Sequence, residues 1–68
     1  MREHKTYVIK AGDFFLANAA TSRMTEEYPD AEKFDTFHKA LAAFRKVVGY
    51  KCRIIQNYGL ENEMTVWK

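Results

Sequence analysis

The alternation of hydrophobic and polar positions divides the chain into several strand-like segments. Residues 6–10 and 14–19 are rich in β-branched and aromatic side chains, and they predict the two strands of a hairpin. Gly12 lies between them and can supply the positive φ of a tight turn. Near the other end, residues 50–58 and 63–67 predict a second hairpin around a turn that contains glycine and asparagine.

The middle of the chain carries a weaker pattern. Residues 20–33 are polar and contain the single proline. Residues 23–28 could extend the second strand or form a loop, and periodicity does not choose between these alternatives. Residues 31–34 predict a short extended segment ahead of the helix.

The helix has the clearest signal, because apolar residues recur at helical spacing after position 36. This stripe consists of Phe37, Leu41, Phe44 and Val48, widened by Ala40, Ala43 and Val47. The opposite arc holds His38, Lys39, Ala42, Arg45 and Lys46. We expect Asp35 to cap the first turn and to pair with Lys39 at i, i+4. Gly49 is expected to end the helix in a left-handed cap.

The order of these elements is β-β-α-β-β. The sequence therefore predicts one α+β domain spanning residues 1–68, with an antiparallel sheet of four strands packed on one α-helix. A fifth strand is added if a short strand forms before the helix.

The predicted strands are apolar on both faces, although one helix can cover only one of them. Tyr7 and Ile9 point one way and Val8 the other, so some of the aromatic side chains Tyr7, Phe15, Tyr58 and Trp67 are expected to be exposed. Two interpretations follow. Either loops cover the second face, or an apolar patch marks the surface for a partner or for a second copy of the chain.

Cysteine usage and the short apolar runs suit a small protein of the cytoplasm, in its own cell or in a host. The single cysteine of the 68 residues excludes an intramolecular disulfide, and a lone thiol suits a reducing compartment. His4 and His38 have no cysteine pair nearby, so a structural zinc is not expected. No secretory signal or membrane-length apolar run is evident, and we expect neither a cofactor nor a membrane association.

Candidate catalytic groups are few. Cys52 lies between the cations Lys51 and Arg53, which would lower its pKa if the thiol were exposed. A small, buried core residue is the alternative that we favour. His38 falls on the polar arc of the helix, and Asp13 lies in the first turn. No phosphate-binding glycine loop, metal-ligand spacing or nucleophile elbow is present, so we expect a protein without enzymatic activity.

Charge is modest overall, at +2, but it is unevenly distributed. An acidic stretch holds Glu26, Glu27, Asp30, Glu32 and Asp35 against one base, Lys33. No acid occurs from residue 36 to residue 60, where the bases are Lys39, Arg45, Lys46, Lys51 and Arg53. Basic residues beside exposed aromatic rings suit nucleic acid, whereas an ordinary solvated helix face would look the same. The acidic stretch could meet a basic protein surface.

The opening Tyr-Val-Ile-Lys strand, the glycine turn, the aromatic strand and the pattern Ala31-x-x-Phe34-x-Thr36-x-x-x-Ala40 together cover residues 6–48. This layout resembles small accessory proteins encoded by bacteriophages, including compact anti-CRISPR proteins. The resemblance implies a protein that occupies a surface on a host protein or protein complex, and it names no functional residue. Several anti-CRISPR proteins are acidic DNA mimics, whereas this chain is slightly basic.

Our first hypothesis is therefore a phage-type inhibitor of a host defence protein such as a CRISPR effector. The expected partner-binding residues are Tyr7, Phe15 and Trp67 on the sheet, and Glu26, Glu27, Asp30 and Glu32 before the helix. The alternative is a sequence-nonspecific nucleic-acid-binding domain that uses Lys39, Arg45, Lys46, Lys51 and Arg53. A homodimer is a third hypothesis.

Overall fold

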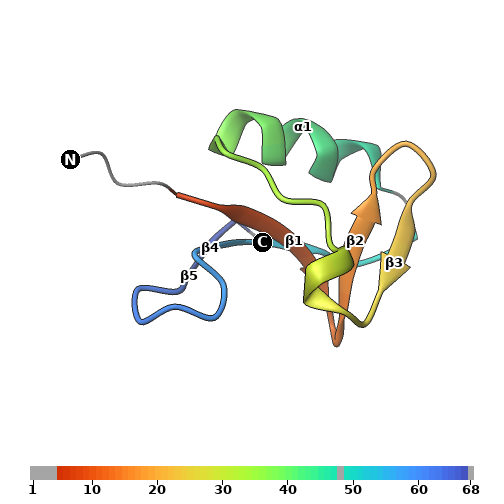
Figure 1. Ribbon diagram of the computed structural model, residues 1–68. Coiled ribbons are helices and arrows are strands. Elements are labelled where there is room, and N and C mark those ends of the chain that lie inside the picture. Colours follow the sequence, from red (N-terminus) through yellow and green to blue (C-terminus); the bar gives the residue numbers. More distant parts are fainter. Residues whose placement is uncertain (1–4, 48, 68) are drawn as a thin grey trace.

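A computed structural model describes residues 5–47 and 49–67 of the chain and confirms the α+β class. Within those residues, five antiparallel strands and one α-helix follow one another in the order β-β-β-α-β-β (Figure 1). The strands are β1 (Tyr7–Ala11), β2 (Phe14–Asn18), β3 (Arg23–Thr25), β4 (Arg53–Gln56) and β5 (Met64–Trp67). The helix is α1 (Phe37–Lys46), and a 3-10 turn, η1 (Tyr28–Asp30), lies between β3 and α1.

The strands are arranged in the order β3-β2-β1-β4-β5, which places β1 at the centre of the sheet and α1 over one of its faces (Figure 1). Both predicted hairpins form, and Gly12 adopts the expected positive φ of 61° in the first turn. Residues 23–28 do not extend the second strand, and they are not simply a loop: residues 23–25 form a separate strand, β3, and Tyr28 begins η1. β3 pairs antiparallel with β2 and is the fifth strand of the sheet.

The segment that precedes α1 is bonded to both β1 and β2. These two strands pair directly only at Lys10–Phe15 and Ala11–Phe14. Farther along, the Glu32 N–H donates to the Leu16 carbonyl (2.9 Å), and Phe34 exchanges two main-chain hydrogen bonds with Tyr7 (2.8 and 2.9 Å). The predicted extended segment 31–34 thus forms, and it carries the chain from η1 to the helix while satisfying the main-chain groups of β1 and β2.

Thr36, and not Asp35, caps the N-terminus of the helix. The Thr36 hydroxyl oxygen accepts a hydrogen bond from the Lys39 N–H at 3.2 Å, which satisfies one free donor of the first turn. Asp35 lies one residue too early for that role. It forms the predicted ion pair with Lys39 instead, at 3.0 Å, and the Lys39 ammonium lowers the pKa of the Asp35 carboxyl.

The end of the helix also differs from the prediction. The helix stops at Lys46, and Val47 is already extended, with its N–H donating to the Phe44 carbonyl. Gly49 has the expected positive φ, 84°, but it lies beyond the helix end and does not cap it. Val48, the last residue of the predicted stripe, lies outside the described residues.

The core beneath the helix follows the predicted stripe. Ala40 and Ala43 are buried against Ile9, Leu16 and Ile54 of the sheet. The larger helix residues Phe37, Leu41 and Phe44 are half-buried around them, as is Val47, which follows the helix. The opposite arc, from His38 to Lys46, is exposed as expected.

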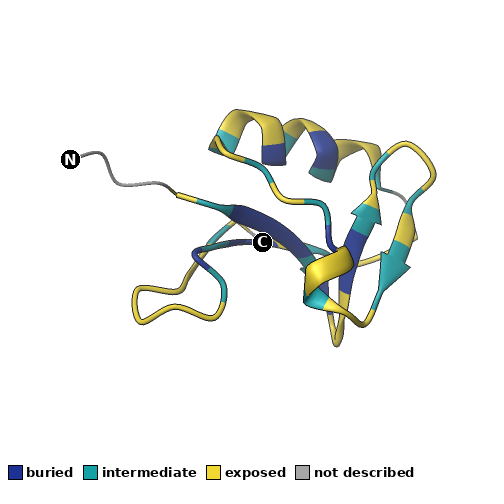
Figure 2. Ribbon diagram, viewed as in Figure 1, coloured by how far each residue is buried: buried dark blue, intermediate teal, exposed yellow. Residues whose placement is uncertain are grey.

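A second, smaller core covers the other face of the sheet, and it corrects two predicted sites. Val8, Phe15 and Ile55 are buried there beneath Ala31, with Tyr28 and Tyr58 packed against them. Phe15 is only 4% exposed, because η1 and the residue after it fold over this face. Tyr7 is 8% exposed and belongs to the core under the helix; Figure 2 shows the ribbon of the central strand, β1, coloured as buried over much of its length. Neither side chain is available to a partner of the folded protein.

Candidate binding surfaces

Exposed large hydrophobic side chains form two groups among the described residues. Three of them, Leu60, Met64 and Trp67, belong to the hairpin of β4 and β5. The other two, Phe14 and Tyr50, lie near the start of β4, where the turn between β1 and β2 lies, and Trp67, opposite Ile54, is the member of the first group on that side. Each location is a candidate binding surface because apolar side chains are otherwise costly to leave in water.

A β-bulge gives β5 an apolar face. Met64 is opposite Gln56 and Thr65 is opposite Ile55, but Trp67, not Val66, is opposite Ile54. The extra residue brings Met64, Val66 and Trp67 to the side of the sheet that Ile54 occupies, the side that bears the helix. Simple alternation would have placed Trp67 on the opposite face from Met64. We call Met64, Val66 and Trp67 the β5 ledge.

The helix covers this ledge only in part: Val66 is half-buried and packs against the core beneath the helix, whereas Met64 and Trp67 are exposed. α1 packs mainly on β1 and β4, and the ring of its residue Phe37 meets that of Trp67 edge-on with 6.0 Å between centroids. Trp67 stays 44% exposed and Met64 56% exposed. Beside the ledge, β5 forms one edge of the sheet and pairs only with β4 within residues 5–47 and 49–67. An edge strand presents unpaired N–H and C=O groups to any further strand.

A second surface lies where the helix ends and β4 begins. A pocket of about 540 Å³ is lined there by Gly12, Phe44, Tyr50, Lys51, Cys52 and Arg53. Tyr50 is 52% exposed, and both cations are exposed. Cys52 is half-buried, and burial raises the pKa of its thiol. The exposed thiol that a lowered pKa would require is therefore not present, and Cys52 packs against the core, as the favoured alternative held.

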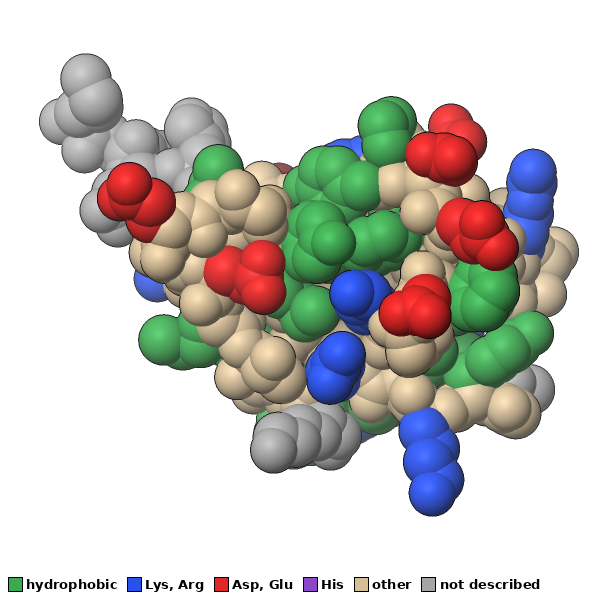
Figure 3. Space-filling view, turned by 90° about the horizontal axis from the view of Figure 1, so that it is seen from below, with side chains coloured by type: hydrophobic (Ala, Val, Ile, Leu, Met, Phe, Trp, Pro, Cys, Tyr) green, Lys and Arg blue, Asp and Glu red, His purple; other side chains and the backbone are tan. Residues whose placement is uncertain are grey.

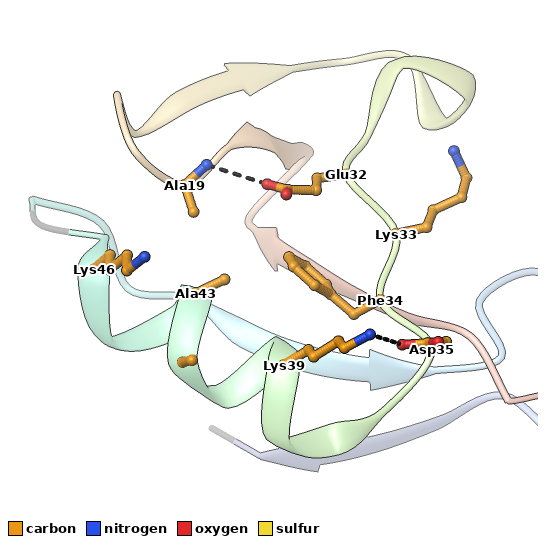
Figure 4. A pocket seen from close by; sticks show the side chains of 9 residues that line it. Ala19, Glu32, Lys33, Phe34, Asp35, Lys39, Ala43 and Lys46 are labelled. Atoms are coloured by element: carbon orange, nitrogen blue, oxygen red, sulfur yellow. Dashed lines mark hydrogen bonds and ion pairs between the residues drawn. The ribbon is translucent and has the colours of Figure 1, made fainter.

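A groove of about 690 Å³ separates α1 from the segment before it (Figure 4). Four of its five charged groups, those of Glu32, Lys33, Asp35 and Lys39, are engaged within the chain, whereas Lys46 is exposed. The Glu32 carboxylate accepts from the Ala19 N–H at 3.2 Å, and Asp35 is paired with Lys39. The Lys33 ammonium points towards η1, where it donates to the carbonyls of Tyr28, Pro29 and Ala31 at 3.0, 3.2 and 3.1 Å. These contacts hold η1 and the segment in place, which is a structural role.

The predicted acidic site is divided by these contacts. Glu26, Glu27 and Asp30 are exposed around η1, whereas Glu32 is partly buried by its bond to Ala19. The exposed acids lie near β3, at the opposite edge of the sheet from Trp67. The structure therefore does not bring the acidic residues and Trp67 into one surface.

The predicted basic site is divided as well. Lys39, Arg45 and Lys46 lie on the exposed arc of α1. Lys51 and Arg53 line the pocket at the start of β4. Of the helix cations, Lys39 already has a carboxylate partner.

Sequence reasoning missed a cluster of aromatic rings and lysines on the sheet face that turns away from the helix. The Phe15 ring lies 5.6 Å from that of Tyr28 and 4.9 Å from that of Tyr58, and the two tyrosines are stacked at 5.0 Å. The Lys10 ammonium lies over Phe15 and Tyr58, at 5.4 and 5.3 Å. Figure 3 shows hydrophobic side chains gathered on this face with basic and acidic groups among and around them. A two-residue turn at Gly12 predicts the Lys10–Phe15 pairing, so part of this cluster had a signal in the sequence.

The other candidate catalytic and metal-ligating side chains are not grouped into a site among the described residues. Among the residues that the structure describes, no three His, Cys, Asp or Glu side chains are grouped to hold a metal ion. His38 and Asp13 are exposed, and His4 lies outside the described residues. Over the same residues, no helix has the length and apolar character needed to cross a membrane.

The β5 ledge with its open strand edge and the pocket beside Tyr50 are thus the two candidate binding surfaces with exposed apolar side chains among the described residues. No protein-family model, curated protein or solved structure matches the chain.

Proposed function

We propose that this chain is a non-catalytic protein-binding domain, and that β5 binds an extended segment of a partner protein by strand addition. The observation that carries the proposal is the position of the β5 ledge beside the open edge of the sheet. One element thereby offers both a row of main-chain hydrogen-bonding groups and exposed apolar side chains. In strand addition, the main-chain hydrogen bonds supply affinity and the side-chain contacts supply specificity.

The composition of the surface favours a protein partner. Tryptophan and methionine are enriched where proteins meet, and buried tryptophan often supplies a large share of the binding energy. Trp67 is already held in place by its contact with Phe37. Trp67 therefore loses less side-chain conformational entropy when a partner covers it than a freely rotating ring would lose.

The class of partner comes from the resemblance to phage accessory proteins. It points to a host defence protein such as a CRISPR effector, which the chain would inhibit by occupying part of its surface. The exposed acids Glu26, Glu27 and Asp30 lie at the other edge of the sheet. In this proposal they speed association with a basic partner but are not part of the ledge contact.

The chain offers a matched pair of substitutions for testing the proposal. Thr65 lies on β5 and is exposed, and Thr21 is exposed in the turn between β2 and β3. Thr65→Lys places a charge on the strand edge, where lysine discourages further pairing. Thr21→Lys makes the same chemical change away from the β5 edge. Met64→Gln is a third variant that removes apolar surface from the ledge while nearly keeping the side-chain length.

Tagged forms of the three variants and the wild-type chain are used to retain proteins from the host cell at moderate salt after nuclease treatment. We expect one protein or complex to be retained by the wild-type chain and by Thr21→Lys, and lost or strongly reduced with Thr65→Lys and Met64→Gln. Main-chain amides of β5 should gain protection from hydrogen exchange when the purified partner is added. Retention that is equal for all four chains, or absent for the wild type, would overturn the proposal.

A second copy of the chain is the competing occupant. Sedimentation of the wild type and of Thr65→Lys over a wide concentration range separates this case. A dimer that Thr65→Lys abolishes would assign the β5 edge to self-association and contradict the proposed partner.

A further inference from the structure

We propose that the pocket at the start of β4 binds single-stranded nucleic acid, with one base stacked on Tyr50 and the flanking phosphates paired with Lys51 and Arg53. This inference uses residues at the other end of β4 from the β4–β5 turn, so it stands or falls separately from the proposed function. It narrows the basic set predicted from the sequence to the two members that line one cavity.

The size and lining of the pocket suit a nucleotide. Its volume of about 540 Å³ falls within the range of ligand sites, roughly 300–1,000 Å³. Phe44 and Tyr50 supply aromatic surface, and half-buried Cys52 adds a small apolar side chain. Gly12 also lines the pocket, and its positive φ of 61° disfavours replacement by a larger residue, although a Cβ there would meet no atom within 4 Å.

The charge around the pocket is complementary to phosphate. Two of its six lining residues are cations, Lys51 and Arg53, and none is an acid. No ion pair involves either cation among the residues that the structure describes. The nearest acid in sequence to a lining residue is Asp13, which is exposed in the turn beside Gly12. Two unpaired cations beside aromatic surface are the combination that binds single strands without sequence preference.

Exposure of the aromatic rings supplies a second, independent observation. Tyr50 is 52% exposed although it adjoins the apolar pocket. Phe14, at the start of β2 next to the turn that contains Gly12, is 43% exposed. Aromatic rings left open at a basic end provide the stacking faces that unpaired bases use, whereas a duplex hides its bases within the stack. These observations therefore favour a single strand.

The test measures fluorescence anisotropy of a labelled oligothymidylate as the full-length chain is added, at several salt concentrations. We expect binding that weakens as salt rises from ~50 to ~200 mM, because phosphate contacts release counterions. Tyr50→Ala should weaken binding about 5- to 150-fold, which is the range for losing one stacked base. Tyr50→Phe keeps the ring and should bind nearly as well as the wild type. Lys51→Gln and Arg53→Gln should each lower the slope of log affinity against log salt by about 0.7.

Lys39→Gln is the matched control for charge, because it removes one positive charge from a residue that is already paired with Asp35 and lies outside the pocket. It should leave the slope close to that of the wild type. Binding that falls equally with Lys39→Gln and Arg53→Gln, or that Tyr50→Ala leaves unchanged, would show general attraction of charge and overturn the site. Failure to bind the oligothymidylate at ~50 mM salt would overturn it as well.

Discussion

Two adjacent phenylalanines provide a sharp test of the second core, the one on the sheet face away from the helix. Phe15 is 4% exposed, contacts the rings of Tyr28 and Tyr58, and lies beneath the Lys10 ammonium. Phe14, its neighbour, is 43% exposed. Replacing each with alanine makes the same chemical change at a buried and at a half-exposed position.

The expected magnitudes differ widely. Truncating a buried phenylalanine costs about 3–5 kcal/mol of the free energy of unfolding, because a cavity remains and the packed rings lose a partner. The whole chain should have about 3–10 kcal/mol, at the usual 0.05–0.15 kcal/mol per residue. Phe15→Ala should therefore remove much of the stability. Phe14→Ala should cost about 1 kcal/mol or less.

Urea unfolding followed by circular dichroism and by the fluorescence of the single tryptophan measures both changes. Phe15→Leu keeps most of the buried volume, so it should stay folded and fall between the wild type and Phe15→Ala. In thermal unfolding, each kcal/mol should lower the midpoint by about 4–8 °C. Equal losses for Phe14→Ala and Phe15→Ala would refute the burial of Phe15 beneath η1. A smaller loss for Phe15→Ala would refute it too.

Three further predictions concern local contacts. Thr36→Ala should destabilise the protein by about 1 kcal/mol in urea unfolding, because the hydroxyl that caps the helix is lost, and Asp35→Ala should have the smaller effect. Asn57 is buried with a φ of 56°, and its side-chain oxygen accepts a hydrogen bond from the Thr6 N–H. Both Asn57→Gly and Asn57→Ala lose this hydrogen bond, but alanine also strains the backbone at positive φ, so Asn57→Gly should be the less destabilising change in urea unfolding. The Asp35 carboxyl should titrate by NMR below its usual 3.8, because the Lys39 ammonium lowers its pKa, and Lys39→Gln should return it. Because the pKa of Asp35 is lower in the folded state than in the unfolded state, the Asp35–Lys39 pair stabilises the folded protein at pH values above the unfolded-state pKa. This stabilisation is lost as the pH falls through the folded-state pKa.

The elements that depend on local pattern were predictable. The apolar stripe of α1, the glycine turn of the first hairpin and the second hairpin each have a periodic or turn signal within a short stretch. The exact cap was not predictable, because Asp35 and Thr36 are adjacent and both residue types cap helices well.

Features that depend on contacts distant in sequence could not be read from the pattern. Phe15 is buried because Tyr28 and Ala31, more than ten positions later, fold over its face. Glu32 belongs to an acidic stretch, but its carboxylate accepts a hydrogen bond from the Ala19 N–H. The ledge exists because a bulge shifts Trp67 relative to Met64, and nothing in the alternation of residues 63–67 signals that shift.

Hydrogen exchange of the β5 amides, with and without the partner retained from the host cell, reports directly on whether β5 binds a partner protein by strand addition. We expect slower exchange at residues 64–67 on adding the partner to the wild type and to Thr21→Lys, and no slowing in Thr65→Lys. Protection confined to the exposed acids around η1, with the β5 amides unchanged, would contradict binding by strand addition.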